Sequence, residues 1–376
     1  MRKTSTDWKC LLSTHQSIDS IGNNIQSTII ELRENVSSSS LPGRDCGRNY
    51  WYGYFTAHSS SILPYIRYSS DQEYIATQLT FINTVHMHHW IRFRAIKGVG
   101  LMEGAGVQIC RTIGYQDVRV DPFLMLDELR LPAEKAAAGF PSHPHRGFET
   151  CTIMKSGKME HKDSVGNHGV IGPGGVQWMT AGRGIIHSEF PAVTEGDLHG
   201  FQLWINLPAK DKMIKPWYQD LQASDIPVIH LRGEESESNV RVMAGEVDGT
   251  SGPLKLRNPG LLFDVSLAPG DEWDYDIPSE WNGFCYVYEG SGFLGKQTVT
   301  SQHAYIFERE GHEGTLHAKA GSGPLKFLLI SGRPINEPIV QYGPFVMNHE
   351  LEIRQAFDDY RNGRLQNPDD DVWAEN

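Results

Sequence analysis

Cysteine, basic charge and long apolar runs are all scarce in this chain of 376 residues, and each scarcity argues against a class of protein. The 5 cysteines are odd in number and none are spaced as CxxC, so the sequence predicts neither a disulfide framework nor a cysteine zinc site. No apolar run approaches the roughly 20 residues of a spanning helix, and we expect no membrane contact. The amino-terminal residues lack a continuous apolar core, so we expect no secretory signal.

Basic residues are outnumbered by acidic ones. Lys and Arg total 34 and Asp and Glu total 46, which gives a formal net charge of −12. Phosphate contacts need clustered Lys and Arg, so the sequence predicts no direct binding of nucleic acid. A basic protein partner is favoured over DNA by the same balance.

Glycine and proline, by contrast, are plentiful, with 38 and 20 copies. Because both residues favour turns, their number predicts many turns and a β-rich body. Residues 1–95 are different in texture: they are rich in serine and have no sustained period of two or of 3.6. We expect an irregular extension there. One short helix is possible over residues 24–36, where Ile25 and Ile29 share a helical face.

From residue 96 onward, short β-prone runs alternate with glycine turns, and this pattern is typical of antiparallel barrels or sandwiches. A faint internal repeat predicts two tandem β-barrels, over residues 96–220 and 221–347, joined through the charged, proline-containing end of the first segment. Residues 348–376 begin with apolar residues at near-helical spacing and predict a carboxy-terminal helix followed by an acidic tail.

Four metal-capable side chains occur as two pairs in the first predicted barrel. His143 and His145 stand two apart in "FPSHPHRGFET", and His187 and Glu189 stand two apart in "TAGRGIIHSEFP". In a strand, residues i and i+2 point to the same face, so two neighbouring strands would place three imidazoles and one carboxylate around one point. Such ligands suit iron, manganese, nickel, copper or zinc, and an octahedral ion would keep two positions open.

The spacing alone leaves a second interpretation open, in which these are turn and surface histidines. The chain has 16 histidines, and "HMHH" at residues 86–89 of the predicted extension shows how readily they generate the same pattern.

The sequence around the four residues resembles the pirin family of the cupin superfamily, in particular eukaryotic and plant pirin-like proteins. The resemblance runs from about Gln108 to about Ala356 and does not cover residues 1–95. The segments that carry it are "DPFLMLDEL", "GFPSHPHRGFET", "HKDSVGNHGVIGPGGVQWMTAGRGIIHSEFP", "GFQLWINLP", "KMIKPWYQDL" and "NEPIVQYGPFVMN".

The resemblance implies an all-β bicupin, which is two tandem antiparallel barrels of jelly-roll type, in a monomer. It also implies one iron ion, Fe(II) or Fe(III), in the amino-terminal barrel, although other divalent metals suit the same ligands. The ligands that it implies are His143, His145, His187 and Glu189, the four residues chosen by strand parity. It implies no metal in the second barrel.

Other candidate site residues also have structural interpretations. Glu149 lies where many cupins place a carboxylate ligand, but with Glu189 in that role we favour structural hydrogen bonding beside the site. Arg146 either pairs with an acidic side chain or flanks the cavity. His161 and Asp163 form another i, i+2 pair, which leaves a second site conceivable, but their polar, turn-rich surroundings favour a surface hairpin.

Two functions follow from the resemblance. The first is flavonol (quercetin) 2,3-dioxygenase activity, with Glu189 as the candidate base that takes the proton of the 3-hydroxyl group. The second is that of a regulatory cofactor in the nucleus or cytoplasm. Such a cofactor binds a transcription regulator or signalling protein, and the oxidation state of its iron alters the docking surface.

Overall fold

The computed structural model describes residues 90–116, 118–192, 196–308 and 314–366, together with three strands nearer the amino terminus. These strands, β1 (Trp8–Ile18), β2 (Asn24–Glu34) and β3 (Trp51–Phe55), form an antiparallel sheet in that order. They belong to one compact unit, Met1–Thr84, and Val85–Asn376 is a second unit.

The helix predicted over residues 24–36 is wrong, because β2 occupies most of that segment. β-Branched isoleucine and threonine are frequent in it, and they favour extended backbone over helix. Strands β1 and β3 flank β2 and pair with its backbone on both sides. The "HMHH" run at 86–89 lies outside the described residues.

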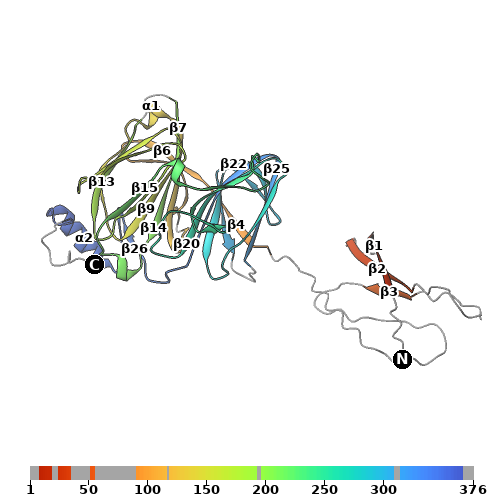
Figure 1. The fold of residues 1–376 in the computed structure, drawn as a ribbon. Coiled ribbons are helices and arrows are strands. Elements are labelled where there is room, and N and C mark those ends of the chain that lie inside the picture. Colours follow the sequence, from red (N-terminus) through yellow and green to blue (C-terminus); the bar gives the residue numbers. More distant parts are fainter. Residues whose placement is uncertain are drawn as a thin grey trace, which may run out of the picture. The chain divides into compact units, whose positions relative to one another are not determined.

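Two antiparallel sheets that face each other form the first barrel (Figure 1). The seven-stranded sheet has the order β15 (Trp217–Leu221), β12 (Val176–Thr180), β9 (Phe148–Ser156), β14 (Asp197–Asn206), β7 (Phe123–Pro132), β6 (Val107–Ile113) and β5 (Val99–Glu103). The four-stranded sheet has the order β11 (His168–Ile171), β10 (Met159–Asp163), β13 (Ile185–Pro191) and β8 (Phe140–His145). A short helix, α1 (Ala133–Ala136), leads from β7 to β8.

The second barrel is built around one nine-stranded antiparallel sheet, and with the first barrel it confirms the predicted all-β bicupin. The main path is β16 (Val228–His230), β17 (Asn239–Ala244), β20 (Gly260–Leu267), β25 (Thr315–Gly332), β22 (Asn282–Leu294), β24 (His303–Glu308) and β4 (Arg92–Lys97). Strand β21 (Glu272–Asp276) pairs with β25 and β23 (Gln297–Thr300) pairs with β22. A small hairpin joins β18 (Glu246–Val247) to β19 (Thr250–Ser251).

The chain enters this unit through the second barrel. The boundary predicted at residues 95 and 96 falls inside β4, and β4 pairs with β24 of the second barrel. Only after β4 does the chain build the first barrel. A period-two pattern within one strand does not reveal such a crossover, because the partner lies about 200 residues later in the chain.

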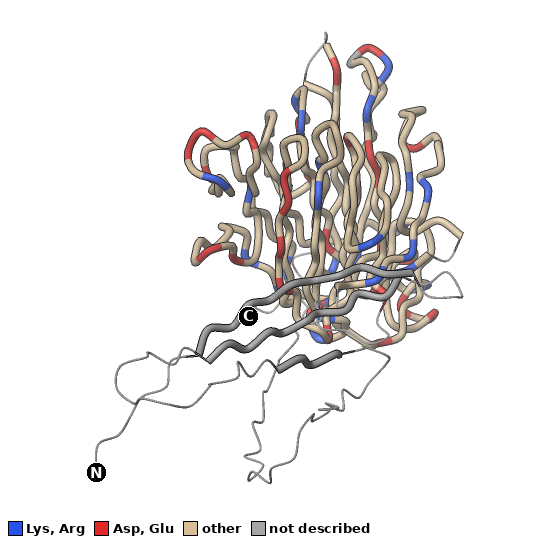
Figure 2. Tube along the Cα trace, turned by 90° about the vertical axis from the view of Figure 1, so that its right-hand side faces the viewer, with Lys and Arg blue, Asp and Glu red and all other residues tan. Residues whose placement is uncertain are grey.

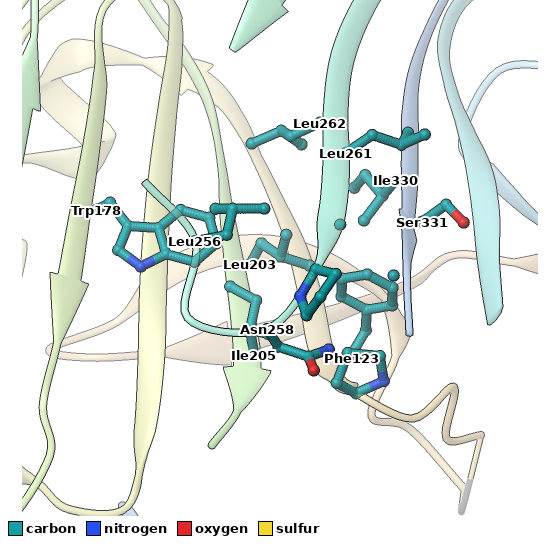
Figure 3. A pocket seen from close by; sticks show the side chains of 14 residues that line it. Phe123, Trp178, Leu203, Ile205, Leu256, Asn258, Leu261, Leu262, Ile330 and Ser331 are labelled. Atoms are coloured by element: carbon teal, nitrogen blue, oxygen red, sulfur yellow. The ribbon is translucent and has the colours of Figure 1, made fainter. Parts of the chain in front are cut away.

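The barrels pack through the seven-stranded and nine-stranded sheets, and their shared core is apolar. Figure 3 shows Trp178 and Leu203 of the first barrel close to Leu262 and Ile330 of the second, around a cavity of about 20 Å³. That volume holds about one water molecule, so the contact is nearly filled. Side chains alternate along each strand, and the other face of the seven-stranded sheet therefore points into the first barrel.

Buried carboxylates add polar contacts between the barrels. The Tyr286 hydroxyl donates to Glu128 at 2.6 Å, and Glu128 also lies 2.8 Å from His199 Nε2. Lys155 of the first barrel pairs with Asp264 of the second, and the Tyr288 hydroxyl donates to the same carboxylate at 2.7 Å. Buried polar groups are costly unless they are paired, so these bonds specify how the two barrels meet.

The segment after the second barrel returns to the first. Strands β26 (Val340–Tyr342) and β27 (Phe345–Met347) precede helix α2 (Glu350–Arg361), which confirms the carboxy-terminal helix. Val346 N donates to Arg146 O at 3.0 Å, and Ile186 of β13 packs against the apolar cluster of α2 and β27. The helix and these strands lie beside the first barrel (Figure 1).

Charged residues of both signs are interspersed along the strands and loops of the two barrels (Figure 2). None of the helices in the described part of the chain has the length and apolar character that crossing a bilayer requires.

One charged residue, Lys212, is almost fully buried, with 1% of its surface exposed. Its ammonium group donates to Gly147 O at 2.7 Å, to Asn206 Oδ1 at 2.6 Å and to Val346 O at 3.0 Å. Lys212 thus joins the corner before β9, the end of β14 and strand β27 by one set of bonds.

We predict that Lys212→Met lowers the free energy of unfolding by about 3 kcal/mol, because it leaves buried oxygen acceptors unpaired. Denaturant titration measures this change. The exposed neighbour Lys210 provides the control, and Lys210→Met should stay within about 0.5 kcal/mol of the parent. Equal midpoints for the parent and Lys212→Met would show that the three bonds contribute nothing net.

Candidate metal centre

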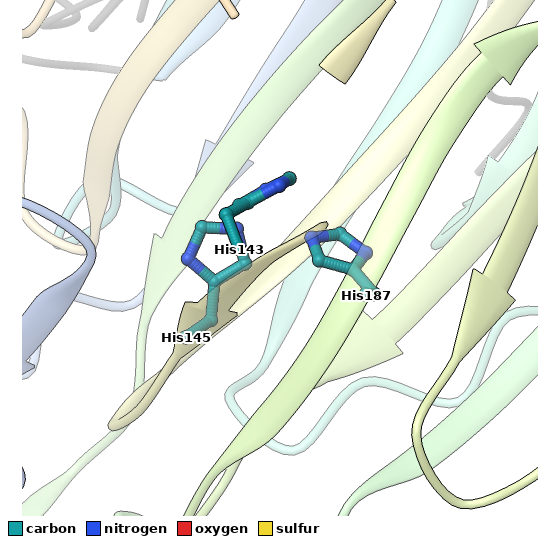
Figure 4. A group of neighbouring side chains, drawn as sticks. All are labelled: His143, His145 and His187. Atoms are coloured by element: carbon teal, nitrogen blue, oxygen red, sulfur yellow. The ribbon is translucent and has the colours of Figure 1, made fainter. Parts of the chain in front are cut away.

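Three histidines meet where β8 runs beside β13 in the four-stranded sheet. Strand β8 is the edge of that sheet, which suits Pro144 because proline has no backbone donor. His187 is paired directly with His143, and Ile185 with His145. The ligand nitrogens of the three histidines all lie within 4.8 Å of one another, and their rings surround one space (Figure 4).

Hydrogen bonds assign the free nitrogen of two of these rings. His143 Nδ1 lies 2.7 Å from Pro141 O and His145 Nδ1 lies 3.4 Å from Pro344 O. A carbonyl oxygen only accepts, so Nδ1 carries the proton and Nε2 keeps its lone pair. His187 is 2% exposed, and neither of its ring nitrogens has a hydrogen-bond partner in the described part of the chain. A transition-metal ion would satisfy these lone pairs, so the residues fit such an ion.

Glu189 lies two residues after His187 in β13, between β8 and β10. An irregularity in the β13–β8 pairing follows His187, so that Glu189 is opposite Phe140 of β8 and, on the other side, opposite His161 of β10. Among the described residues, Glu189 forms a second metal-capable group with His161 and His187, again within 4.8 Å. The structure thus brings the three predicted histidines together and places Glu189 next to one of them.

Burial sets the charge of the site. It lowers the pKa of His143, and it lowers the pKa values of His145 and His187 further, with the neighbouring histidines adding to the effect. The neutral imidazole that results is the form that binds a metal. Burial also raises the pKa of Glu189 to about 7, against the hydrogen bond from Thr152 Oγ1, which lies 3.3 Å from Glu189 Oε1. A bound cation would favour the ionised carboxylate.

His161 is the site residue that the sequence interpretation missed. Strands β10 and β11 do form a hairpin, but the predicted surface position is wrong, because His161 is 2% exposed. Its Nδ1 lies 2.7 Å from Gln177 Oε1, and its Nε2 has no partner among the residues described. Met159 and His161 point inward while Lys162 is exposed. That alternation of "MEHKD" was the signal available in the sequence.

A row of polar residues crosses the inner face of the seven-stranded sheet at one register. Neighbouring strands pair Gln177 with Thr152, Thr152 with Gln202, Gln202 with Asp127 and Asp127 with Arg111. Thr152 Oγ1 donates to Gln202 Oε1 at 2.6 Å, and Arg111 holds Asp127 through two bonds of 2.7 Å. The row faces the metal-capable groups across the barrel, as the contact between Thr152 and Glu189 shows.

A cavity of about 810 Å³ opens beside the histidines, within the size range of small-molecule sites. His143, His145 and Glu189 line it, and so do Arg111 and Asp127 of the polar row. Apolar side chains supply much of the remaining wall: Met125, Leu129, Met154, Leu198, Phe201 and Trp204. Apolar walls with a few convergent polar groups are typical of a site for a small, largely aromatic or aliphatic molecule.

Glu149 and Arg146 lie near the site with structural contacts. Glu149 is 2% exposed, accepts a hydrogen bond from Thr180 Oγ1 at 2.6 Å and belongs to neither metal-capable group. Arg146 donates to Arg183 O and pairs with Asp359 of α2 at 2.8 Å, so it ties the corner between β8 and β9 to the helix.

Burial raises the pKa of Glu149 to about 6 from an ordinary value of 4.5. The native state therefore binds this proton more tightly, and its contribution to stability is present below pH 4.5 and is lost as the pH rises through 6. We predict that the parent loses about 2 kcal/mol relative to Glu149→Gln between pH 4 and pH 7. Denaturant titration at the two pH values measures this, and a constant difference would contradict it.

Comparison with known proteins agrees with this geometry. The pirin sequence profile matches residues 106–205, and the profile of the pirin C-terminal cupin domain matches residues 262–366. A pirin-like protein of Solanum lycopersicum is 48% identical over 265 residues, which are 70% of this chain and 88% of the relative. Pirin-1 of Arabidopsis thaliana is 44% identical over 267 residues, 70% of this chain and 90% of its own.

A solved structure has the same fold. The quercetin 2,3-dioxygenase from Acinetobacter baumannii superposes with a TM-score of 0.68 at 35% identity, over 74% of this chain and 99% of its own. The two profile matches cover the barrel with the histidines and most of the second barrel. The resemblance noted in the sequence is thereby confirmed, and the chain belongs to the pirin family of cupin proteins.

Proposed function

We propose that this protein is a metal-dependent dioxygenase that opens flavonols such as quercetin, with one iron ion held by His143, His145, His187 and Glu189. The observation that carries the proposal is His187, whose two buried nitrogens lack partners among the described residues and which lies beside two histidines with free Nε2 atoms, at a cavity of about 810 Å³. The similarity to a quercetin 2,3-dioxygenase of Acinetobacter baumannii supports the choice of reaction.

The ligand set suits the metal. Imidazole and carboxylate ligands bind iron as well as manganese, nickel and zinc, and four of them leave open positions on a six-coordinate ion. When bound, the ion supplies Lewis acidity toward a hydroxyl oxygen of the substrate and one-electron chemistry toward dioxygen. The carbonyl oxygens of Pro141 and Pro344 hold the rings of His143 and His145, so that both Nε2 atoms are oriented before the metal arrives.

Glu189 is the proposed base. Its carboxylate lines the cavity and is contacted at Oε1 by the Thr152 hydroxyl, which is itself bonded to Gln202. The single Thr152 proton is shared unequally between Gln202 Oε1 at 2.6 Å and Glu189 Oε1 at 3.3 Å, so the carboxylate remains able to accept the proton of the 3-hydroxyl group. To do so, the carboxylate must hold the ion loosely enough to keep one oxygen available for that proton.

The walls fit a planar substrate. Trp204 lies with its ring centroid 5.1 Å from that of His145 and 4.4 Å from that of Phe148, so the apolar wall reaches the ligands themselves. Aromatic rings of a flavonol pack well on such surfaces, and the apolar side chains keep water from the reacting atoms.

A second function, that of a regulatory cofactor, is supported by the hairpin of β26 and β27. Pro344 O, in its turn, contacts His145 Nδ1, while Tyr342 at the end of β26 is 69% exposed. A change in the charge of the metal would therefore act on a surface loop, and a transcription regulator or signalling protein is the proposed partner. In this role the protein would act as a monomer in the nucleus or the cytoplasm.

We predict that His187→Ala lowers bound iron, measured by elemental analysis after anaerobic loading, by at least about tenfold, because His187 joins both groups of ligands. Quercetin turnover in air, followed by loss of its absorbance, should fall with it. His168→Ala is the matched control, since His168 is exposed and bonded to Glu160. Full iron content in folded His187→Ala would remove this histidine from the centre.

Glu189→Gln separates a base from a ligand. We expect quercetin turnover to fall by about 100-fold or more while bound iron falls far less, since glutamine retains a ligand oxygen but does not accept the proton. If iron content and turnover fall by the same factor, Glu189 acts only as a ligand.

Iron-replete protein without turnover, whose affinity for a partner changes on oxidation, would favour the regulatory function over the enzymatic one.

A further inference from the structure

The second metal-capable group consists of His161, His187 and Glu189. The proposed four-ligand centre does not account for His161, whose buried Nε2 has no partner in the described part of the chain. We propose that these three residues form an inner position for a divalent transition-metal ion. This inner position shares His187 with the outer group of His143, His145 and His187. The two groups are alternatives for one ion, because both require His187.

The tautomer of His161 follows from a chain of hydrogen bonds that begins at Asp220. Gln177 Nε2 donates to Asp220 Oδ1 at 2.9 Å, and a carboxylate oxygen accepts only from the amide nitrogen, so the Gln177 amide has one orientation. Gln177 Oε1 is then the atom 2.7 Å from His161 Nδ1, which must carry the proton. His161 Nε2 is left with its lone pair, the arrangement found in metal-binding histidines.

Strand pairing aims that lone pair at the other two residues. His161 of β10 is directly opposite Glu189 of β13, and directly paired residues in an antiparallel sheet project from the same face. The His161 and His187 rings have centroids 4.9 Å apart. All three residues are at least nine-tenths buried, with exposures of 2%, 2% and 6%. His161 Nε2 and both nitrogens of His187 lack partners in the described part of the chain.

The chemistry of the inner set differs from that of the outer one. Two histidines and one carboxylate are the ligand set of many non-haem Fe(II) oxygenases, and they leave positions open for substrate and oxygen. The proposed four-ligand centre and the inner position both contain His187 and Glu189, so each offers a divalent ion the negative charge of one carboxylate. They differ in the remaining ligands, which are His143 and His145 in the first case and His161 in the second.

This inference rests on the proposed metal centre, through His187 and Glu189, and the test separates the two. The full-length double variant His143→Ala with His145→Ala lacks the outer set. We expect it to bind one Co²⁺ per chain, with a Kd within about 100-fold of the parent. Adding His161→Ala should weaken Co²⁺ binding by a further 100-fold or so, measured by titration calorimetry. His168→Ala in the double variant is the control and should change nothing.

Three results would overturn the inner position. The first is a folded double variant that binds no Co²⁺. The second is an equal Co²⁺ affinity of the double variant with and without His161→Ala. The third is a parent protein that binds no Co²⁺, and this result would overturn the proposed metal centre as well. If the double variant does not fold, His143→Ala alone replaces it, since His143 is the least buried of the three outer histidines. In that background His161→Ala must still weaken Co²⁺ binding by about 100-fold.

Discussion

The backbone register of β13 between β8 and β10 is the constraint on which the site depends. It places His187 opposite His143 on one side, and Glu189 opposite His161 on the other. A slip of β13 by one residue would turn His187 and Glu189 to the opposite face of the sheet from His143 and His161. Burial specifies the register, because the side chains on the inner face of this sheet contact polar residues of the seven-stranded sheet. Glu189 contacts Thr152, and His161 contacts Gln177.

The second barrel supports this geometry by packing against the face of the seven-stranded sheet that points away from the site. Its nine-stranded sheet covers the outer face of the seven-stranded sheet with an apolar core, which leaves the inner face for polar residues such as Thr152 and Gln202. The returning carboxy-terminal segment closes the remaining side, since Pro344 O contacts His145 and Arg146 pairs with Asp359. The cavity, with charged and metal-capable groups on its wall, is thus enclosed by packed elements of both the first barrel and the returning segment.

Short-range pattern was enough to predict a body of many short strands, and it grouped His143 with His145 and His187 with Glu189. The period of two in HPH and HSE is local, so strand parity placed His143 with His145 without knowledge of the fold. The position of Glu189 beside His161 depends on the pairing of β13 with β10, and no local pattern encodes which strand lies beside β13. The same limit applies to Lys212, whose three acceptors come from separate parts of the chain, and to the pairing of β4 with the second barrel.

The proposed metal centre requires that buried imidazoles in the first barrel hold one metal ion. X-ray absorption spectroscopy of the iron-loaded, full-length protein measures this, because scattering from imidazole rings is distinctive. We predict a single iron environment with oxygen and nitrogen neighbours only, near 2.0–2.2 Å, and at least two imidazole ligands. Iron without imidazole scattering, or iron bound through sulfur, would contradict it.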